Sequence, residues 1–129
     1  MKMARPILRA EPGALPARNA AITLALLGAN LFFNMVANAG FKLSAMSTTW
    51  RSFLAWQVVG NLAGFVTVLT LTGLLRYLPL HVAYPVTAGL TALGVQVIVA
   101  RLIFGETISS TQWFGALLVA AGIVLIGGG

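Results

Sequence analysis

The chain has 129 residues, of which 59% are hydrophobic and only 8% are charged, and its formal net charge is +6. A soluble domain carries about a quarter charged residues, so this composition excludes an ordinary soluble protein and indicates an integral membrane protein. There is no cysteine, which excludes a disulfide framework, a thiolate metal site and a cysteine nucleophile. The excess of cations fits membrane topology and anionic lipid, and nucleic acid is not an expected partner because no basic patch is interleaved with exposed aromatic residues.

The chain divides into a basic N-terminal segment and one membrane domain. Residues 1–19 carry four cations, three prolines and a glycine without apolar periodicity, so we expect a disordered tail. Alternatively, the basic segment and the apolar run that follows it form a signal peptide, with Ala37-Asn38-Ala39 as its cleavage site. Residues 20–129 are predicted to be all-α, a bundle of four transmembrane helices that forms a dimer, with spans at about 20–43, 53–75, 81–104 and 111–126.

The first predicted span carries a polar side chain every four residues. These are Asn30, Asn34, Asn38 and Lys42, and Asn19 is placed to cap the helix. Amides and an ammonium that faced hydrocarbon would be costly, so this seam should face protein or water. It either holds helices together through hydrogen bonds or lines a site for a polar ligand. For Lys42 we favour a functional role, because nothing nearby in the sequence neutralises its charge.

The second predicted span carries a pattern that is typical of close helix packing. Gly60 and Gly64 form a Gly-x-x-x-Gly pattern, which lets another helix approach closely. Asn61 lies near the same face, and Ser47, Thr48 and Thr49 are candidate N-caps in the loop before the span.

The third predicted span is the one that we expect to form a wall of the site. Large apolar residues such as Val86 and Leu90 recur at steps of three and four, and we expect them to face lipid. The other face carries small or polar residues, among them Gly89, Ala92 and Gln96, and should face protein or a cavity. Arg101 either extends to the lipid head groups or contacts an anionic ligand.

The loop and the fourth span give three further predictions. Glu106 is the only acid in the membrane domain, and we expect it to pair with Arg101 or to cap a helix. Ser109 and Gln112 form a capping box at the start of the fourth span. Gly115 and Gly122 are one heptad apart on an almost wholly apolar helix, which indicates contact between two copies.

From Val82 to the end, the sequence resembles the last two helices of the small four-helix members of the drug/metabolite transporter superfamily. The resemblance rests on Ala83-Tyr84-Pro85, Gly105-Glu106, Trp113 and the run Gly115 to Gly122, and it extends more weakly to Lys42. In the small multidrug resistance family, that last run is the dimer interface. The resemblance therefore implies a dimer interface at Gly115, Ala116, Val119 and Gly122.

The sequence departs from the drug exporters of this superfamily at one important position. Those proteins place a glutamate in helix 1, eight residues before the lysine, where this chain has Asn34. It also lacks their helix 3 tryptophan, with Thr87 close to that place. The chain is more similar to the flippase subunits that move undecaprenyl-phosphate-linked aminoarabinose across the inner membrane. The resemblance thus implies a flippase for a polyprenyl-phosphate-linked sugar in the bacterial inner membrane, acting as a homodimer or with a related small protein.

The residue types agree with an anionic lipid head group as substrate. Cations at the ends of the bundle suit a phosphate, and neutral amides within it suit sugar hydroxyls. The predicted substrate-binding residues are Asn34, Asn38, Lys42, Asn61, Tyr84, Gln96, Arg101 and Glu106. Two alternatives stay open, an exporter of small cations or metabolites and an accessory membrane subunit that does not transport.

We expect no enzyme activity, because the sequence has no catalytic triad, carboxylate pair or metal-ligand set. No cofactor is expected, since no glycine-rich phosphate loop is present. Counting cations on the two sides of the four spans gives Lys2, Arg5, Arg9, Arg18 and Arg76 against Lys42, Arg51 and Arg101. This bias places both termini in the cytoplasm.

Overall fold

The computed structural model describes residues 17–129, which form helices and the short loops that join them. The chain runs through α2 (Ala17–Ala45), α3 (Trp50–Leu74), α4 (Leu80–Gly94), the π-helix η1 (Val95–Ile103) and α5 (Ser110–Gly128). Because η1 continues α4 without a break, the two form one span of 24 residues. Within the described residues four helices are long and apolar enough to cross a membrane, which confirms the all-α, four-span prediction.

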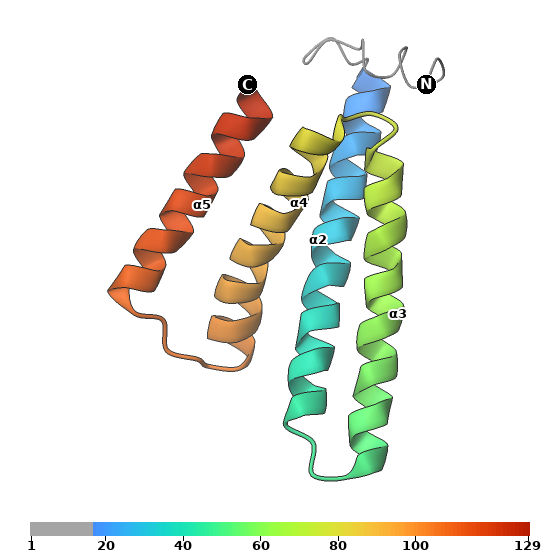
Figure 1. Cartoon of the computed structure of the whole chain (residues 1–129), viewed down its shortest axis with the longest axis vertical. Coiled ribbons are helices and arrows are strands. Elements are labelled where there is room, and N and C mark those ends of the chain that lie inside the picture. The colour runs from blue at the N-terminus through green and yellow to red at the C-terminus, as the bar shows by residue number, and fades with distance from the viewer. Residues whose placement is uncertain (1–16) are drawn as a thin grey trace.

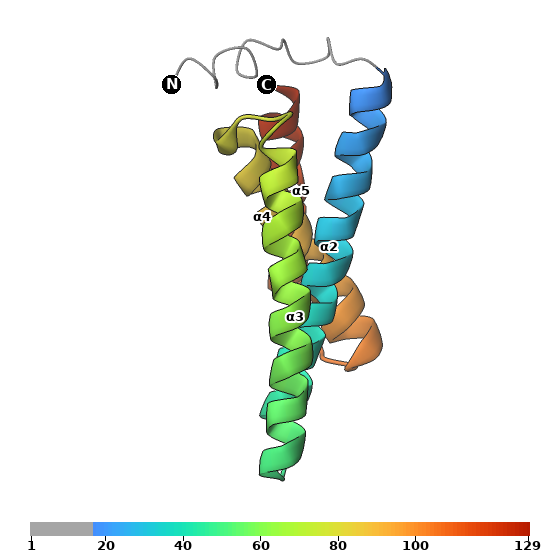
Figure 2. The ribbon, with the colours of Figure 1, turned by 90° about the vertical axis from the view of Figure 1, so that its right-hand side faces the viewer.

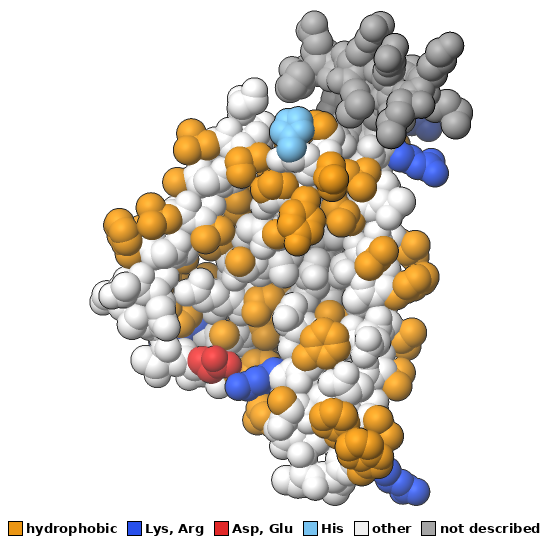
Figure 3. Space-filling model, in the orientation of Figure 1, with side chains coloured by type: hydrophobic (Ala, Val, Ile, Leu, Met, Phe, Trp, Pro, Cys, Tyr) orange, Lys and Arg blue, Asp and Glu red, His pale blue; other side chains and the backbone are white. Residues whose placement is uncertain are grey.

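The helices form two antiparallel pairs that meet along one side (Figures 1 and 2). The longest contact is between α2 and α3, and α5 packs against α4; the α4–η1 span also contacts α2. Hydrophobic side chains cover much of the face in Figure 3, and the few charged ones lie toward its ends. The exposed surface is that of a protein surrounded by lipid rather than water.

The predicted tail falls largely outside the described residues, since these begin at residue 17. Its last three positions are the first turn of α2, so Asn19 lies inside the helix and the prediction that it caps the helix is wrong. Two other caps are confirmed. The Thr49 hydroxyl accepts a hydrogen bond from the N–H of Ser52, and Ser109 and Gln112 make both bonds of the capping box.

The close packing of α2 on α3 depends on two glycines. A Cβ atom at Gly40 would lie 3.2 Å from the backbone nitrogen of Gly60. A Cβ atom at Gly60 would collide with the ring of Phe41 and lie 3.2 Å from the carbonyl oxygen of Ala37. Gly64, the second glycine of the predicted pattern, has no atom within 4 Å of such a position. The pattern therefore contributes its first glycine to packing, and the partner glycine comes from α2.

The third span differs from its prediction in which face is buried. Val86, expected to face lipid, is buried at 9% exposure. Gly89, expected to face protein or a cavity, does so: it packs against α5, where the side chains of Ile123 and Val119 fill the space that its missing Cβ leaves. The periodicity identified the faces of the helix but not the neighbour that each one meets.

Candidate functional site

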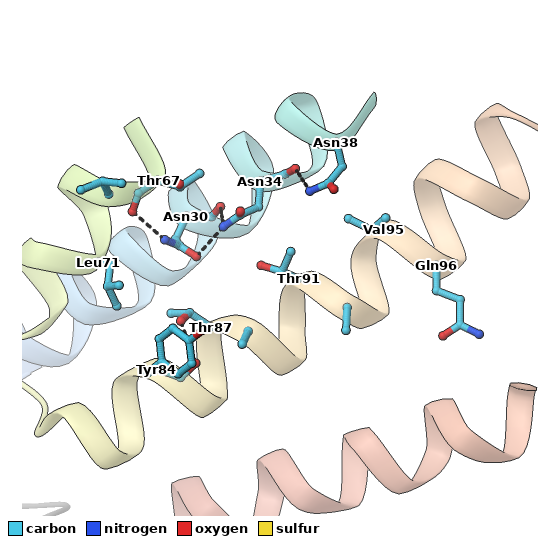
Figure 4. Close-up of a pocket in the computed structure, with 13 residues that line it drawn as sticks. Asn30, Asn34, Asn38, Thr67, Leu71, Tyr84, Thr87, Thr91, Val95 and Gln96 are labelled. Atoms are coloured by element: carbon cyan, nitrogen blue, oxygen red, sulfur yellow. Dashed lines mark hydrogen bonds between the residues drawn. The ribbon is translucent and has the colours of Figure 1, made fainter. Parts of the chain in front are cut away.

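A hollow of about 560 Å³ lies between the α2–α3 pair and the α4–η1 span. Figure 4 shows the side chains that line it, and the asparagine seam of α2 forms one wall. The opposite wall comes from α4 and the start of η1. The lining residues are Asn30, Asn34, Asn38, Thr67, Val68, Leu71, Tyr84, Thr87, Ala88, Thr91, Ala92, Val95 and Gln96.

The three asparagines of the seam have different partners. Asn30 is 3% exposed, and its Nδ2 donates to the carbonyl of Thr67 and to the hydroxyl of Thr70 on α3, each at 3.0 Å. Asn34 Nδ2 donates to the backbone oxygen and to Oδ1 of Asn30. Asn38 Nδ2 donates to the carbonyl of Asn34 at 2.8 Å. Asn30 therefore connects two helices, whereas the other two bond only within α2.

This arrangement leaves two amide oxygens of the lining without a hydrogen-bond partner among the described residues. The amide N–H groups of Asn34 and Asn38 are directed to the backbone of α2, so their Oδ1 atoms are available to a ligand. On the opposite wall, Thr87 donates its hydroxyl proton to the carbonyl of Tyr84. The buried hydroxyl of Thr91 has no partner among the residues that the structure describes, and Figure 4 shows it pointing toward α2. The hollow thus carries a few hydrogen-bonding groups in a mainly apolar lining, and no acidic or basic side chain lines it.

The hollow opens toward the surroundings of the bundle. Val68 and Tyr84, which both line it, are 58% and 60% exposed. Apolar side chains at its edge, together with the aromatic ring of Tyr84, would let a lipid tail stay in the membrane while a polar group enters. A soluble ligand would not need such an opening.

Lys42 and Glu106 form an ion pair at the end of the asparagine seam. Lys42 Nζ lies 3.5 Å from Glu106 Oε2, and both side chains are about half exposed. The prediction that Glu106 pairs with Arg101 is therefore wrong. The reason lies in Gly105, whose φ of 67° turns the chain sharply after η1, so that the backbone N–H of Glu106 reaches the carbonyl of Ala100. This turn directs the carboxylate to α2.

The structure brings together only some of the predicted substrate-binding residues. Asn34, Asn38, Tyr84 and Gln96 line the hollow, although the Gln96 amide points away from the asparagines and donates to the carbonyl of Gln112 on α5 at 3.4 Å. Lys42 lies one turn beyond Asn38 and outside the lining. Asn61 is exposed on α3 and bonds to Gln57, and Arg101 is exposed on η1.

Sequence reasoning missed Thr67, Leu71 and Thr91 as lining residues. Thr91 had a usable signal, since it lies four residues after Thr87 on the same helix face. Thr67 also had a signal, since it lies on the face of the second span that carries Gly60, Asn61 and Gly64. For Leu71 no such signal exists, because the asparagine seam meets α3 only after the two helices have packed.

Of the four predicted dimer residues, two pack within the chain and two lie at its surface. Ala116 is buried at 8% exposure, and Val119 faces Gly89 of α4. Gly115 and Gly122 have nothing within 4 Å of where a Cβ atom would stand. Two of the four residues thus pack within the chain, and the two glycines leave a shallow strip on its surface.

Four helices that are long and apolar enough to cross a membrane, with a hollow between them, are the architecture of a multi-pass membrane protein. Comparison with curated proteins gives the family. The chain is 35% identical over 81 residues to the probable 4-amino-4-deoxy-L-arabinose-phosphoundecaprenol flippase subunit ArnE of Pseudomonas fluorescens (strain Pf0-1), covering 63% of this chain and 68% of that protein. The chain belongs to the small multidrug resistance-like members of the drug/metabolite transporter superfamily, as the resemblance in its sequence implied.

Two further relatives are multidrug resistance proteins. The chain is 43% identical over 74 residues to the multidrug resistance protein EbrB of Bacillus atrophaeus and 42% identical over 74 residues to EbrB of Bacillus subtilis (strain 168). Each alignment covers 56% of this chain and 62% of the relative, which is less than two thirds of its length. No family model matches the chain, and no solved structure matches it.

Proposed function

We propose that this transporter is a flippase for a polyprenyl-phosphate-linked sugar or a similar anionic lipid head group in a bacterial inner membrane. The single observation that carries the proposal is the uncharged hollow between the spans, which sets the amides of Asn34 and Asn38 in a mainly apolar lining and opens to the surroundings on one side. Sugar hydroxyls are donors, and they fit the Oδ1 atoms of Asn34 and Asn38, which accept no hydrogen bond among the described residues.

The phosphate belongs at the end of the hollow and not inside it. Within the hollow the described side chains offer few N–H or O–H donors, because the asparagine amides already donate to the backbone. Lys42, one turn beyond Asn38, supplies an ammonium group, and its partner Glu106 is half exposed and able to move away. The polyprenyl tail then lies in the membrane beside Val68 and Tyr84.

A second candidate is an exporter of small organic cations, and one observation favours it. Carbonyl and hydroxyl oxygens that face the hollow would also bind an ammonium group, and two of the relatives are multidrug resistance proteins. However, Asn34 cannot ionise and no carboxylate lines the hollow, so proton exchange at this place has no group to carry the proton.

The test is transport by the purified full-length protein in liposomes. We expect a labelled undecaprenyl-phosphate-linked aminosugar to move between leaflets, measured by its accessibility to a membrane-impermeant reagent. Asn34→Leu and Asn38→Leu should each slow this movement at least tenfold, whereas the lipid-facing control Leu62→Ala should not. Uptake of ethidium in exchange for protons, with no movement of the lipid-linked sugar, would overturn the proposal in favour of the cation exporter. No transport of either compound would favour an accessory subunit.

A further inference from the structure

A second hollow, of about 370 Å³, lies between α2 and α3 near the end where α2 begins and α3 ends. Its lining residues are Ile22, Leu26, Leu69, Thr72, Gly73, Arg76 and Tyr77, none of which lines the first hollow. Its walls come from α2, α3 and the turn that follows α3, so it lies outside the proposed transport path. Figures 1 and 2 show this end of the two helices in two views.

The hollow is apolar along its length and basic at its mouth. Ile22, Leu26 and Leu69 form hydrocarbon walls, and Gly73 leaves room for Leu26, whose Cδ1 would lie 3.3 Å from a Cβ atom there. Arg76 stands in the turn after α3, where the chain leaves the membrane, and its side chain is exposed. Apolar walls below a guanidinium group match the two parts of a phospholipid.

The charge of Arg76 has no counter-ion within residues 17–129. The one acid there, Glu106, pairs with Lys42. It also lies at the opposite end of the bundle, since one complete span separates it from the turn that holds Arg76. Arg18, in the first turn of α2, adds a second cation at the same end as Arg76. Arg18 and Arg76 form no ion pair among the described residues, and two such cations at one end favour an anionic partner.

Two hydroxyl groups belong to the lining of this hollow, and one of them is free to donate to a phosphate. The Thr72 hydroxyl is used, because it donates to the carbonyl of Val68 at 2.9 Å. The Tyr77 hydroxyl makes no hydrogen bond among the described residues and is available beside Arg76. The volume of about 370 Å³ leaves room for more than a single solvent molecule.

We propose that this groove binds one anionic phospholipid, with its phosphate on Arg76 and Tyr77 and an acyl chain along Ile22, Leu26 and Leu69. The occupant is a membrane phospholipid and not a transported substrate. The site would fix the end of the bundle that carries Arg18 and Arg76 to an anionic leaflet. It would therefore contribute to the orientation of the chain in the membrane.

The test is native mass spectrometry of the full-length protein released from micelles that contain either phosphatidylglycerol or phosphatidylcholine. We expect one tightly retained phosphatidylglycerol per chain and at least fivefold less retained phosphatidylcholine. Arg76→Gln should lower phosphatidylglycerol retention about fivefold. Arg51→Gln, an exposed arginine at the opposite end, is the matched control and should leave it unchanged.

A second pair of variants tests the apolar walls and keeps the test independent of charge. Leu69→Trp fills the groove, and Leu62→Trp places the same bulk on an exposed position of the same helix outside both hollows. Only Leu69→Trp should reduce retention, with both variants keeping the thermal melting profile of the wild type. Equal retention of the two lipids, equal effects of the two arginine variants, or displacement of the lipid by soluble glycerol phosphate would overturn the proposal.

Discussion

At the scale of single residues, the three asparagines of the α2 seam have two different roles. Asn30 is buried and connects α2 to α3 through two hydrogen bonds. Asn34 and Asn38 bond only within their own helix and line the hollow. One polar seam thus begins as a structural contact and continues as the wall of a site.

This division predicts different results for substitutions one turn apart. Asn30→Leu should destabilise the protein by about 1 kcal/mol, because Thr70 and the Thr67 carbonyl lose a buried donor. Asn34→Leu should change stability by less than half of that and still abolish transport. Thermal unfolding in detergent and transport in liposomes, measured on the same preparations, check both statements. Equal destabilisation by the two variants would show that Asn34 is also a structural residue.

The Lys42–Glu106 pair predicts opposite effects for its two members. An exposed pair contributes at most about 1 kcal/mol, so an anionic head group can displace the carboxylate from the lysine. Glu106→Gln should therefore tighten binding of a labelled polyprenyl-phosphate-linked sugar about threefold. Lys42→Gln should weaken it about tenfold, because a charge-assisted contact is lost.

The measurement for this pair is equilibrium binding of the labelled lipid to the detergent-solubilised protein. Arg51→Gln removes a cation at the same end of the bundle but outside the hollow, and it should leave the affinity unchanged. Weaker binding by both Glu106→Gln and Lys42→Gln would mean that the pair acts as a unit that holds the loop, and not as a competitor for the phosphate.

At the scale of helices, the contact between α2 and α3 depends on Gly40 and Gly60. Since a Cβ atom on either one would press on the facing helix at 3.2 Å, Gly40→Ala and Gly60→Ala should each destabilise the protein by about 1–3 kcal/mol. Gly64→Ala, four residues from Gly60 and facing empty space, is the control and should be neutral. Unfolding in increasing denaturant checks this. A similar loss for Gly64→Ala would mean that another chain covers that position.

The π-helical end of the third span has a consequence for the site. In η1 the hydrogen bonds extend one residue further than in an α-helix, as in the bond from the Phe104 N–H to the Val99 carbonyl. Residues after Gly94 are therefore rotated relative to a continuous α-helix. Gln96, the second residue of η1, still lines the hollow, and its amide donates to the carbonyl of Gln112 on α5.

At the scale of the whole molecule, composition and periodicity predicted the class, the four spans and the polar seam, because each of these depends on local sequence alone. The partner of each face could not be predicted in the same way. Val86 and Gly89 lie on the helix faces that their spacing indicates, but their neighbours follow from how α4 packs between α2 and α5. The partner of Glu106 depends on one left-handed glycine, Gly105, and on a loop that no periodicity describes.

The last prediction concerns assembly, since α5 packs on α4 by one face only. Ala116 and Val119 belong to that face, whereas Gly115 and Gly122 leave a strip with nothing within 4 Å of their missing Cβ atoms. A strip of small residues on an apolar helix lets a second helix approach closely. We therefore expect Gly115→Ile and Gly122→Ile to weaken dimerisation at least tenfold without changing the fold of the single chain.

The matched control is Ala121→Ile, which adds bulk to an exposed position on another side of α5. Energy transfer between labelled chains in liposomes, followed as the ratio of protein to lipid decreases, measures the dimerisation equilibrium. If Ala121→Ile dissociates the dimer and the glycine variants do not, the interface lies on the other side of the helix. If the wild type shows no transfer at any ratio, the strip fits a different small membrane protein, and the glycine variants should then prevent co-purification of that partner.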